Sequence, residues 1–253
     1  IALASAMFFF ANTAFGQSQR IAFVEEATQA SCPPCASANP GIQTLVNNNS
    51  ETTLFLAYQV WWPGFDQMYL DNTAGVDERV GNYYPFTFAP QVILNGTFPS
   101  GGDGGAATFT QGTIDDITAQ ASEFDIDIAA VVEDGSLHVT GTVTATMVAE
   151  GNLVLRIMLA EDLITIEDAP GGTNGETEYH HVFKAFVGGP AGIDISDSWA
   201  VGDVYTIDES LPLGGYTIYH FDGLEVFAIV QNDDDKFVHQ AAVVHDIEIT
   251  TNF

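Results

Sequence analysis

The chain has 253 residues, of which 46% are hydrophobic, and its 34 acidic and 5 basic side chains give a formal net charge of −29 at pH 7. This charge argues against nucleic acid and anionic membrane surfaces as partners, because an acidic surface repels both. The length is sufficient for two cores of ordinary size, so two domains are expected.

The first 16 residues, IALASAMFFFANTAFG, form an apolar stretch that ends on the small-residue pattern Ala14-Phe15-Gly16. Such a stretch is typical of part of a secretory signal peptide, with cleavage expected before Gln17; a buried N-terminal helix is the alternative. A bilayer-spanning helix takes about 20 apolar residues, so no transmembrane span is predicted. We therefore expect an exported protein in the periplasm, at the outer membrane or on the surface of a Gram-negative bacterium, where disulfides persist.

Residues 17–122 alternate between strand and helix patterns, which predicts an α/β domain. Strands are expected at 20–28, 52–60 and 90–98, the last being a hairpin of two strands that turns at Asn95-Gly96. Helices are expected at 34–48, 75–84 and 111–122. The glycine-rich segment 99–108 lacks the Lys and Ser/Thr of a phosphate-binding loop and is interpreted as a flexible turn.

Residues 123–253 have no helical pattern, and 24 of the 34 acidic residues lie in this half. Strand-like runs separated by Gly, Asp and Asn predict an all-β antiparallel sandwich of immunoglobulin-like type. The expected strands are 124–133, 136–148, 152–163, 179–188, 204–211, 225–232 and 237–249.

The only two cysteines, Cys32 and Cys35, lie in the segment SCPPC, where a strand is expected to end and a helix to begin. A disulfide across so short a ring restricts the unfolded chain by only about 2 kcal/mol, so a purely structural role is inefficient. A zinc site needs four ligands and no second CxxC is present, so no metal is expected here. A helix N-terminus stabilises a thiolate, which favours redox chemistry with Cys32 as the more exposed nucleophile and Cys35 as the resolving thiol.

Further features resemble the thioredoxin-like superfamily. Pro40 follows the second cysteine by five residues, where that superfamily commonly has a proline in its active-site helix. Glu26, six residues before the first cysteine, matches the superfamily's buried acid that takes protons from the resolving cysteine, with Glu25 as the competing position. Ala89-Pro90 precedes a strand as the superfamily's cis-proline does. The resemblance implies a thioredoxin-like fold for the first domain and a substrate groove shaped by Pro90.

More narrowly, the segments VEEATQASCPPCASANPG, DERVGNYYPFTFAPQVILNG and EYHHVFKAFVGG resemble an exported family known as the twenty-eight-kilodalton outer-membrane protein family. Its members pair a thioredoxin-like domain with a β-sandwich. The resemblance implies domains at 17–122 and 123–253 and an association with the outer membrane. The family name records a location and implies no settled activity.

The cysteine motif departs from thioredoxins, which usually carry an aromatic residue before the first cysteine and Gly-Pro between the two. Here Ser31 and Pro33-Pro34 occupy those positions. Neither proline has an N–H that could turn toward a Cys32 thiolate. We therefore expect Cys32 to be less acidic than in strongly oxidising relatives.

Several aromatic residues leave two interpretations open. Trp61 and Trp62 form either an apolar platform for a polypeptide or glycan beside the cysteines, with Ala89, or a cover for the sheet edge. The segment with Tyr83, Tyr84 and Phe86 poses the same choice.

Arg79, the adjacent pair His180-His181 and the run of three aspartates at 233–235 are expected to have structural roles. Arg79 is expected to pair with a carboxylate. His180 and His181 are expected on opposite faces of a strand, because successive side chains alternate, and so not in one site. Asp233-Asp234-Asp235 is expected to form a hairpin turn, since it lacks the alternate spacing of a calcium loop.

The function expected is thiol–disulfide exchange with protein thiols or disulfides and no cofactor. Cys32 attacks, Cys35 resolves, Glu26 assists proton transfer and Pro90 shapes the groove. The alternatives are a surface binding or adhesion protein without redox activity, and a structural component of the envelope.

Overall fold

The structure is a computed structural model and describes residues 17–84 and 86–250. The expected signal peptide, residues 1–16, lies outside the described residues. Within the described ranges, no helix has both the length and the apolar character needed to cross a membrane.

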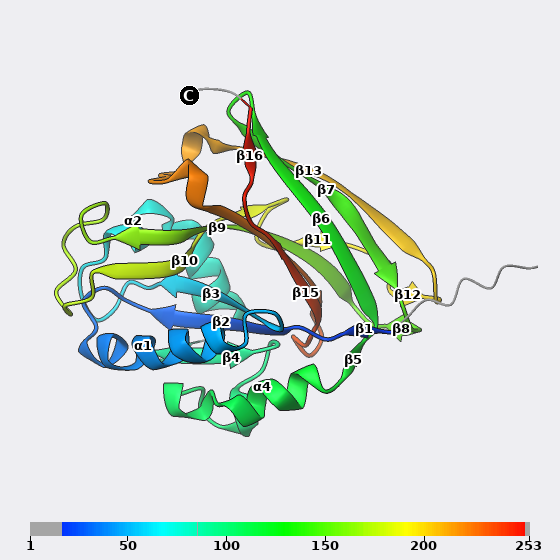
Figure 1. Cartoon of the computed structure of the whole chain (residues 1–253), viewed down its shortest axis with the longest axis horizontal. Coiled ribbons are helices and arrows are strands. Elements are labelled where there is room, and N and C mark those ends of the chain that lie inside the picture. The colour runs from blue at the N-terminus through cyan, green and yellow to red at the C-terminus, as the bar shows by residue number, and fades with distance from the viewer. Residues whose placement is uncertain (1–16, 85, 251–253) are drawn as a thin grey trace, which may run out of the picture.

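One large sheet runs through both halves of the chain (Figure 1). Its strand order is β15-β14-β9-β10-β3-β2-β4, with the short β11 (Ile193–Asp194) beside β9. Parallel strands β2 and β3 and the antiparallel β4 form the α/β portion that the sequence predicts. The strands are β2 (Ala22–Thr28), β3 (Thr53–Gln59), β4 (Gln91–Leu94), β9 (Leu153–Thr165), β10 (Glu178–Val187), β14 (Leu224–Asn232) and β15 (Val238–Val244).

A smaller sheet covers part of the large one and completes a β-sandwich. Its order is β13-β7-β6-β16, with β6 (Phe124–Glu133), β7 (Ser136–Ala145), β13 (Val204–Pro212) and β16 (Glu248–Ile249). Val139 and Val143 of β7 share a core with Leu155 and Ile157 of β9. Two short pairs accompany these sheets, β1 (Ser18–Gln19) with β5 (Ala121–Ser122) and β8 (Ala149–Glu150) with β12 (Ser198–Trp199).

The sandwich differs from the expected antiparallel domain in two ways. Strand β10 pairs in parallel with β3 at Val182 and Ala57, and β16 pairs in parallel with β6. One layer of the sandwich therefore continues into the α/β portion rather than ending at a domain boundary. The division at residues 122 and 123 stays a prediction.

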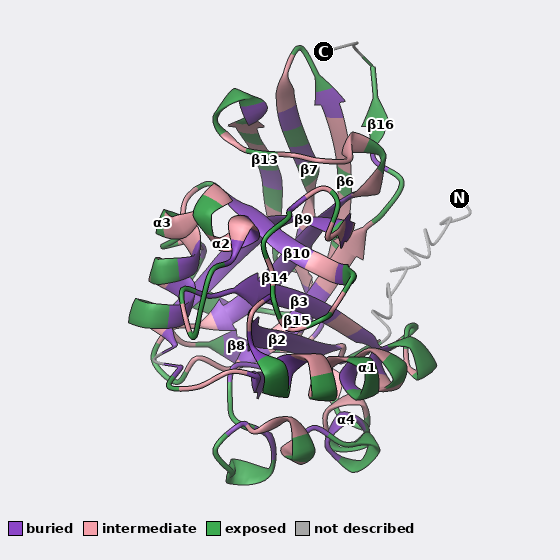
Figure 2. Cartoon of the chain, turned by 90° about the vertical axis from the view of Figure 1, so that its left-hand side faces the viewer, coloured by how far each residue is buried: buried purple, intermediate pink, exposed green. Residues whose placement is uncertain are grey.

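Helices cover both faces of the α/β portion. Helices α1 (Pro33–Asn48) and α4 (Gln111–Thr118) pack on one face, while α2 (Gln67–Asp71), α3 (Thr73–Val76) and the wider π-type turn η1 (Asp77–Tyr83) lie on the other. Figure 2 shows the strands largely buried between them, with exposed residues on the outer helix surfaces. Short 3-10 turns are η2 (Pro99–Gly101), η3 (Ala106–Thr108), η4 (Leu213–Gly215) and η5 (Phe221–Gly223).

The expected hairpin at residues 90–98 is only partly formed. Asn95 and Gly96 have φ angles of +44° and +84°, and Leu94 and Thr97 exchange hydrogen bonds of 2.8 and 3.1 Å across this turn. The return strand is absent from the described residues 97–105, because Pro99 has no N–H and the chain enters η2. The turn prediction was therefore correct and the second strand was wrong.

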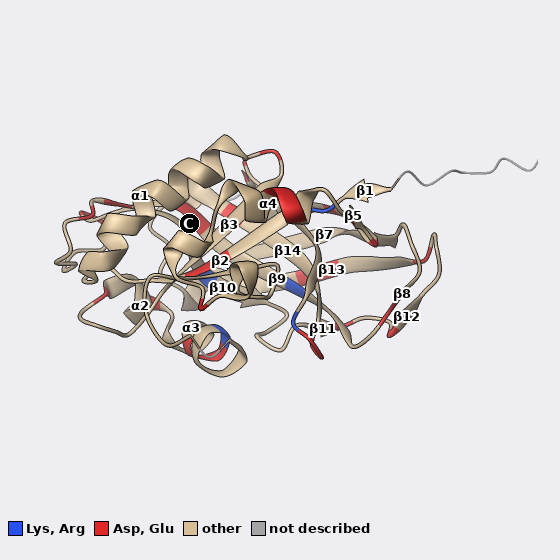
Figure 3. Ribbon diagram, turned by 90° about the horizontal axis from the view of Figure 1, so that it is seen from below, with Lys and Arg blue, Asp and Glu red and all other residues tan. Residues whose placement is uncertain are grey.

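All five basic side chains are buried or half-buried, so the exposed charged side chains are Asp and Glu. Figure 3 marks the positions of both kinds of residue, basic and acidic, along the ribbon. Four of the basic side chains form ion pairs, which are Arg20 with Glu123, Arg79 with Glu25, Arg156 with Asp233 and Lys184 with Glu161. The fifth, Lys236, lies over the ring of Tyr83. The expected carboxylate partner of Arg79 is confirmed.

Candidate functional site

The two cysteines form a disulfide at the start of α1, with Cα atoms 5.3 Å apart. Cys32 is the N-cap residue of the helix, and its Sγ accepts the N–H of Cys35 at 3.2 Å. Pro33 and Pro34 occupy the first two helical positions and have no N–H to donate. The positive end of the helix therefore faces Cys32 with fewer backbone donors than a helix start ordinarily provides.

Neither cysteine is open to solvent. Cys32 is 2% exposed and Cys35 is fully buried, whereas Pro33 and Pro34 between them are exposed. Cys32 is the more exposed of the two, as expected, but only slightly, because residues distant in the sequence cover it.

Residues 171–177, between β9 and β10, form a strap across the cysteine loop. The N–H groups of Thr173 and Asn174 donate to the carbonyl of Ala30 at 3.0 and 3.1 Å. The side-chain amide of Asn174 donates to the carbonyls of Gln29 and Cys32 at 3.2 and 3.3 Å. The strap is thus fixed to the backbone that carries Cys32.

Pro90 lies beside the disulfide, as the resemblance implied. The Ala89–Pro90 peptide is cis, and Cys32 Sγ lies 3.5 Å from the carbonyl oxygen of Ala89. The segment before β4 therefore forms a second wall around Cys32.

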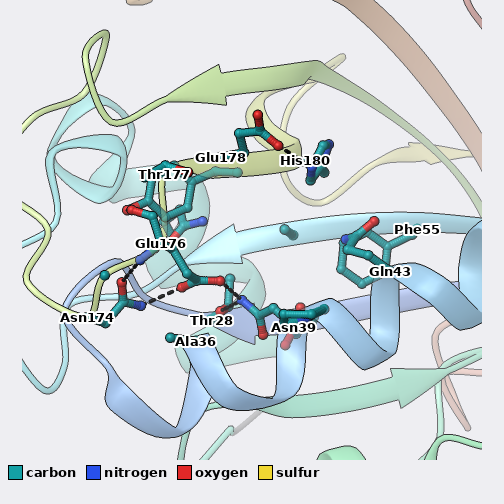
Figure 4. A pocket seen from close by; sticks show the side chains of 16 residues that line it. Thr28, Ala36, Asn39, Gln43, Phe55, Asn174, Glu176, Thr177, Glu178 and His180 are labelled. Atoms are coloured by element: carbon teal, nitrogen blue, oxygen red, sulfur yellow. Dashed lines mark hydrogen bonds and ion pairs between the residues drawn. The ribbon is translucent and has the colours of Figure 1, made fainter.

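A cavity of about 560 Å³ opens between α1, the sheet and the strap (Figure 4). It includes Glu26 of β2, Asn39 and Pro40 of α1, and Asn174 and Glu176 of the strap. Figure 4 shows the Glu176 side chain reaching from the strap toward α1. Its carboxylate accepts hydrogen bonds from both asparagines, 2.8 Å in length from Asn39.

Glu26 is the most deeply buried acid of this cavity. It is 1% exposed, and its Oε1 atom has no hydrogen-bond partner. Burial, aided by the negative charge of Glu176, raises the pKa of Glu26 well above its ordinary value. A carboxyl group whose pKa is raised in this way keeps its proton to a higher pH than an ordinary glutamate and can exchange it with a neighbouring group.

Glu25, the competing acid, lies in a different environment. Arg79 donates to both of its carboxylate oxygens, at 2.7 and 2.9 Å, and the Tyr58 hydroxyl donates at 2.9 Å. Such charge-assisted, two-pronged hydrogen bonds are among the strongest that a carboxylate forms in a protein. Glu25 is therefore a structural ion-pair partner, whereas Glu26 belongs to the cavity beside α1.

The aromatic loop lies next to the cysteine loop. Trp61 and Phe65 are 43% and 48% exposed, whereas Trp62 is half-buried against the core. The Ser31 hydroxyl donates to the carbonyl of Phe65 at 2.6 Å and fixes the two loops together. Phe65 is thus an exposed apolar side chain beside the motif, and Trp61 of the same loop packs against Trp62 and Tyr69.

The second aromatic segment has a structural position. Tyr84 and Phe86 are buried in the core on the α3 side of the sheet, and Tyr83 is half-buried. These residues cover the sheet rather than form a platform.

Four polar residues near the cysteines were missed in the sequence. Asn39, Asn174 and Glu176 carry no local motif, and the last two lie in a turn 142 residues or more from Cys32. Asp66 had a recognisable signal as the N-cap of α2, and it also accepts the N–H of Ala30 at 2.7 Å. Burial, opposed by its backbone hydrogen bonds, raises the pKa of Asp66 to about 6.

The two adjacent histidines do not alternate as expected. His181 has a φ angle of +51°, and its ring centroid lies 6.3 Å from that of His180 and 6.1 Å from that of Phe55. His180 lines the cavity with the same Phe55, so both rings lie on one side of the sheet. The prediction of opposite faces was wrong because the left-handed conformation at His181 interrupts the strand periodicity.

The aspartate run has the predicted local structure. Residues 233–235 form the turn between β14 and β15. The carboxylate of Asp233 pairs with Arg156 at 2.8 Å and accepts the Tyr83 hydroxyl at 2.7 Å.

No protein-family model matches the sequence, and no curated protein matches it. Among solved structures, the fold is similar to HBP35 of Porphyromonas gingivalis, with a TM-score of 0.71, 12% identity, and coverage of 94% of this chain and 79% of that chain. This similarity supports a thioredoxin-like, mixed α/β fold.

Two further solved structures have lower structural similarity. A protein from Agrobacterium tumefaciens matches with a TM-score of 0.48 and 14% identity over 94% of this chain and 100% of its own. A domain of the outer membrane lipoprotein Omp28 from Porphyromonas gingivalis matches with a TM-score of 0.32 and 15% identity over 51% of this chain and 92% of its own. At these scores neither match carries an argument about the present chain.

Proposed function

We propose that this chain is an exported thiol–disulfide oxidoreductase that exchanges disulfides with protein partners through Cys32 and Cys35. The observation that carries the proposal is the position of Cys32 Sγ, between the N–H of Cys35 and the carbonyl of Ala89. The apolar N-terminal stretch supports export, and the resemblance of the sequence supports association with the outer membrane.

In the oxidising direction, a partner thiolate attacks Cys32 Sγ and breaks the Cys32–Cys35 bond. Cys35 leaves as a thiolate and takes a proton, for which Glu26 is the buried donor. A second partner thiolate then attacks the mixed disulfide and releases Cys32, so that the partner gains a disulfide and this chain two thiols. The reducing direction runs through the same mixed disulfide.

Burial of Cys32 adds a requirement for this chemistry. A partner sulfur cannot approach Cys32 while the strap and the Ala89–Pro90 segment cover it, so exchange needs local opening. Trp61 and Phe65 would then provide the apolar contact for a partner polypeptide.

The same burial favours a second candidate function. A protein that uses the exposed Trp61 and Phe65 side chains for binding, and keeps an inert disulfide as part of the scaffold, would also bury both cysteines. This binding or adhesion protein is the alternative that the experiment must separate from the oxidoreductase.

The test is to equilibrate the purified mature chain with glutathione redox buffers and to trap mixed disulfides. We expect a definable potential, a stable mixed disulfide in Cys35→Ser and none in Cys32→Ser. The Cys32 pKa is expected above about 5, outside the range of strong oxidants. A disulfide that stays oxidised in the folded chain across all buffers would support the binding protein instead.

A further inference from the structure

A second cluster of side chains with metal-binding groups lies on the large sheet, on strands separate from the cysteine motif. Asp162 is on β9, His181 on β10 and Glu225 on β14, and His245 directly follows β15. These strands are consecutive neighbours in the sheet, and their registers bring the four positions to the same end. One side chain from each strand therefore enters the cluster.

The donor atoms of the cluster converge on Glu225. His181 Nδ1 lies 2.7 Å from Glu225 Oε2, and His245 Nδ1 lies 2.6 Å from Glu225 Oε1. Asp162 Oδ1 lies 3.7 Å from His181 Nδ1, and the ligand atoms of Asp162, His181 and Glu225 are all within 4.8 Å of one another. Ligands of one tetrahedral zinc ion, bound at about 2.0–2.2 Å, lie about 3.4 Å apart, so small side-chain shifts would suffice.

The carboxylates of the cluster have no Lys or Arg partner among the described residues, which favours binding of a cation. The Glu225 side chain is 3% exposed, and in residues 17–84 and 86–250 its ion pairs involve the two histidines and no Lys or Arg. Asp162 adds a second carboxylate. Two negative charges thus lie together with only imidazoles to compensate them.

The cluster is accessible from one side. The side chains of Asp162 and His245 are 57% and 56% exposed, while His181 is 20% exposed and packs edge-on against Phe55. The φ angle of +51° at His181, uncommon for a residue with a side chain, interrupts strand alternation where its ring enters the cluster. An ion could enter from solvent and bind against a buried carboxylate.

We propose that Asp162, His181, Glu225 and His245 form a binding site for one Zn²⁺ ion. Imidazole and carboxylate donors without a thiolate suit zinc among the divalent metals. The ion would connect β9 and β10 to β14 and β15 at one end of the large sheet, which assigns it a structural role independent of the cysteines.

The experiment is zinc titration by calorimetry of the full mature chain, oxidised and without a purification tag, since free thiols would also bind zinc. We expect one ion per chain in the wild type. The variants His245→Ala and Asp162→Asn should each weaken zinc affinity at least about tenfold, since the first removes an imidazole ligand and the second replaces a charged carboxylate oxygen with a neutral amide oxygen. Both side chains are exposed, so both variants should fold, which circular dichroism without zinc checks.

The matched control is His138→Ala, which removes an exposed imidazole from β7. This control should keep the wild-type zinc affinity and the zinc-induced rise in unfolding temperature, whereas His245→Ala should lose that rise. If the wild type shows no saturable one-to-one binding, or if His245→Ala and His138→Ala bind zinc equally, the cluster is a hydrogen-bonded His-Glu-His array and the proposal fails.

Discussion

Glu25 and Glu26 are adjacent in β2, yet their carboxyl groups have opposite environments. Successive side chains of a strand point to opposite faces, so Glu25 meets Arg79 while Glu26 points into the cavity beside α1. The first carboxylate is compensated by a cation, and the second is buried with an unpartnered oxygen. The pair shows that residue type alone does not decide the role of a buried acid.

Replacing Glu26 with Gln should stabilise the protein at neutral and higher pH. The pKa of Glu26 is raised in the folded state above its ordinary value of 4.5. The contribution of protonated Glu26 to the free energy of unfolding is therefore complete below pH 4.5, and it is lost as the pH rises through the folded pKa. We expect Glu26→Gln to increase the free energy of unfolding by about 1–3 kcal/mol at pH 8, with no gain at pH 4. Urea unfolding at both pH values measures this, with the exposed Glu51→Gln as control. A gain that is equal at both pH values would contradict it.

Breaking the Arg79–Glu25 pair from one side should be strongly destabilising. Both side chains are essentially fully buried, so Arg79→Met leaves a buried carboxylate without its cation. We expect a loss of about 3–5 kcal/mol in chemical denaturation. The double variant Arg79→Met/Glu25→Leu should recover most of this loss, because it removes both charges. A single variant as stable as the double one would show that the uncompensated charge is not the cause.

At the level of elements, the strap is bound to the loop that carries the disulfide. Its residues lie between two strands of the sandwich and hydrogen-bond to the loop that precedes α1. The sequence pattern marks this segment only as the connection between two predicted strands, because its partners are about 140 residues away. By contrast, β2, α1 and β3 were predicted nearly to their ends, since strand alternation and the prolines at the helix start are local signals.

The variant Asn174→Ala should open the strap more often. It removes the side-chain hydrogen bonds to the carbonyls of Gln29 and Cys32, and one hydrogen bond contributes about 1 kcal/mol. We expect the disulfide to be reduced by dithiothreitol about fivefold faster than in the wild type. Thiol labelling over time under native conditions measures the rate. The control is Asn152→Ala in an exposed loop elsewhere, and equal rates for the two variants would show that the strap does not limit access.

At the scale of the whole molecule, the two halves share a sheet and a core. The rings of Phe23 and Phe227 lie 6.2 Å apart, and those of Tyr58 and Phe183 lie 4.9 Å apart. The Asn95 carbonyl accepts the N–H of Val238 at 3.2 Å, which joins the end of β4 to the start of β15. A core built by both halves couples their stabilities.

We therefore expect the chain to unfold in one cooperative transition. Fluorescence can follow each half, because Trp199 lies in the sandwich and Trp61 and Trp62 lie in the α/β portion. The Trp199→Phe variant reports fluorescence from the α/β portion alone, and the Trp61→Phe/Trp62→Phe variant reports fluorescence from the sandwich alone. In each variant, the urea midpoint measured by fluorescence should equal the midpoint measured by circular dichroism. Two separated transitions would instead support independent domains at 17–122 and 123–253.

The amino-acid sequence was sufficient to predict the local elements, the cysteine pair at a helix start, the Asn95-Gly96 turn and a carboxylate as the partner of Arg79. These features depend on neighbours within a few residues or on the cost of burying an unpaired charge. Only the tertiary structure decided that a distant strap buries Cys32, that one sheet serves both halves, and that His181 and His245 meet at Glu225. Such contacts depend on how strands pair across more than 100 residues, and local periodicity carries no information about that pairing.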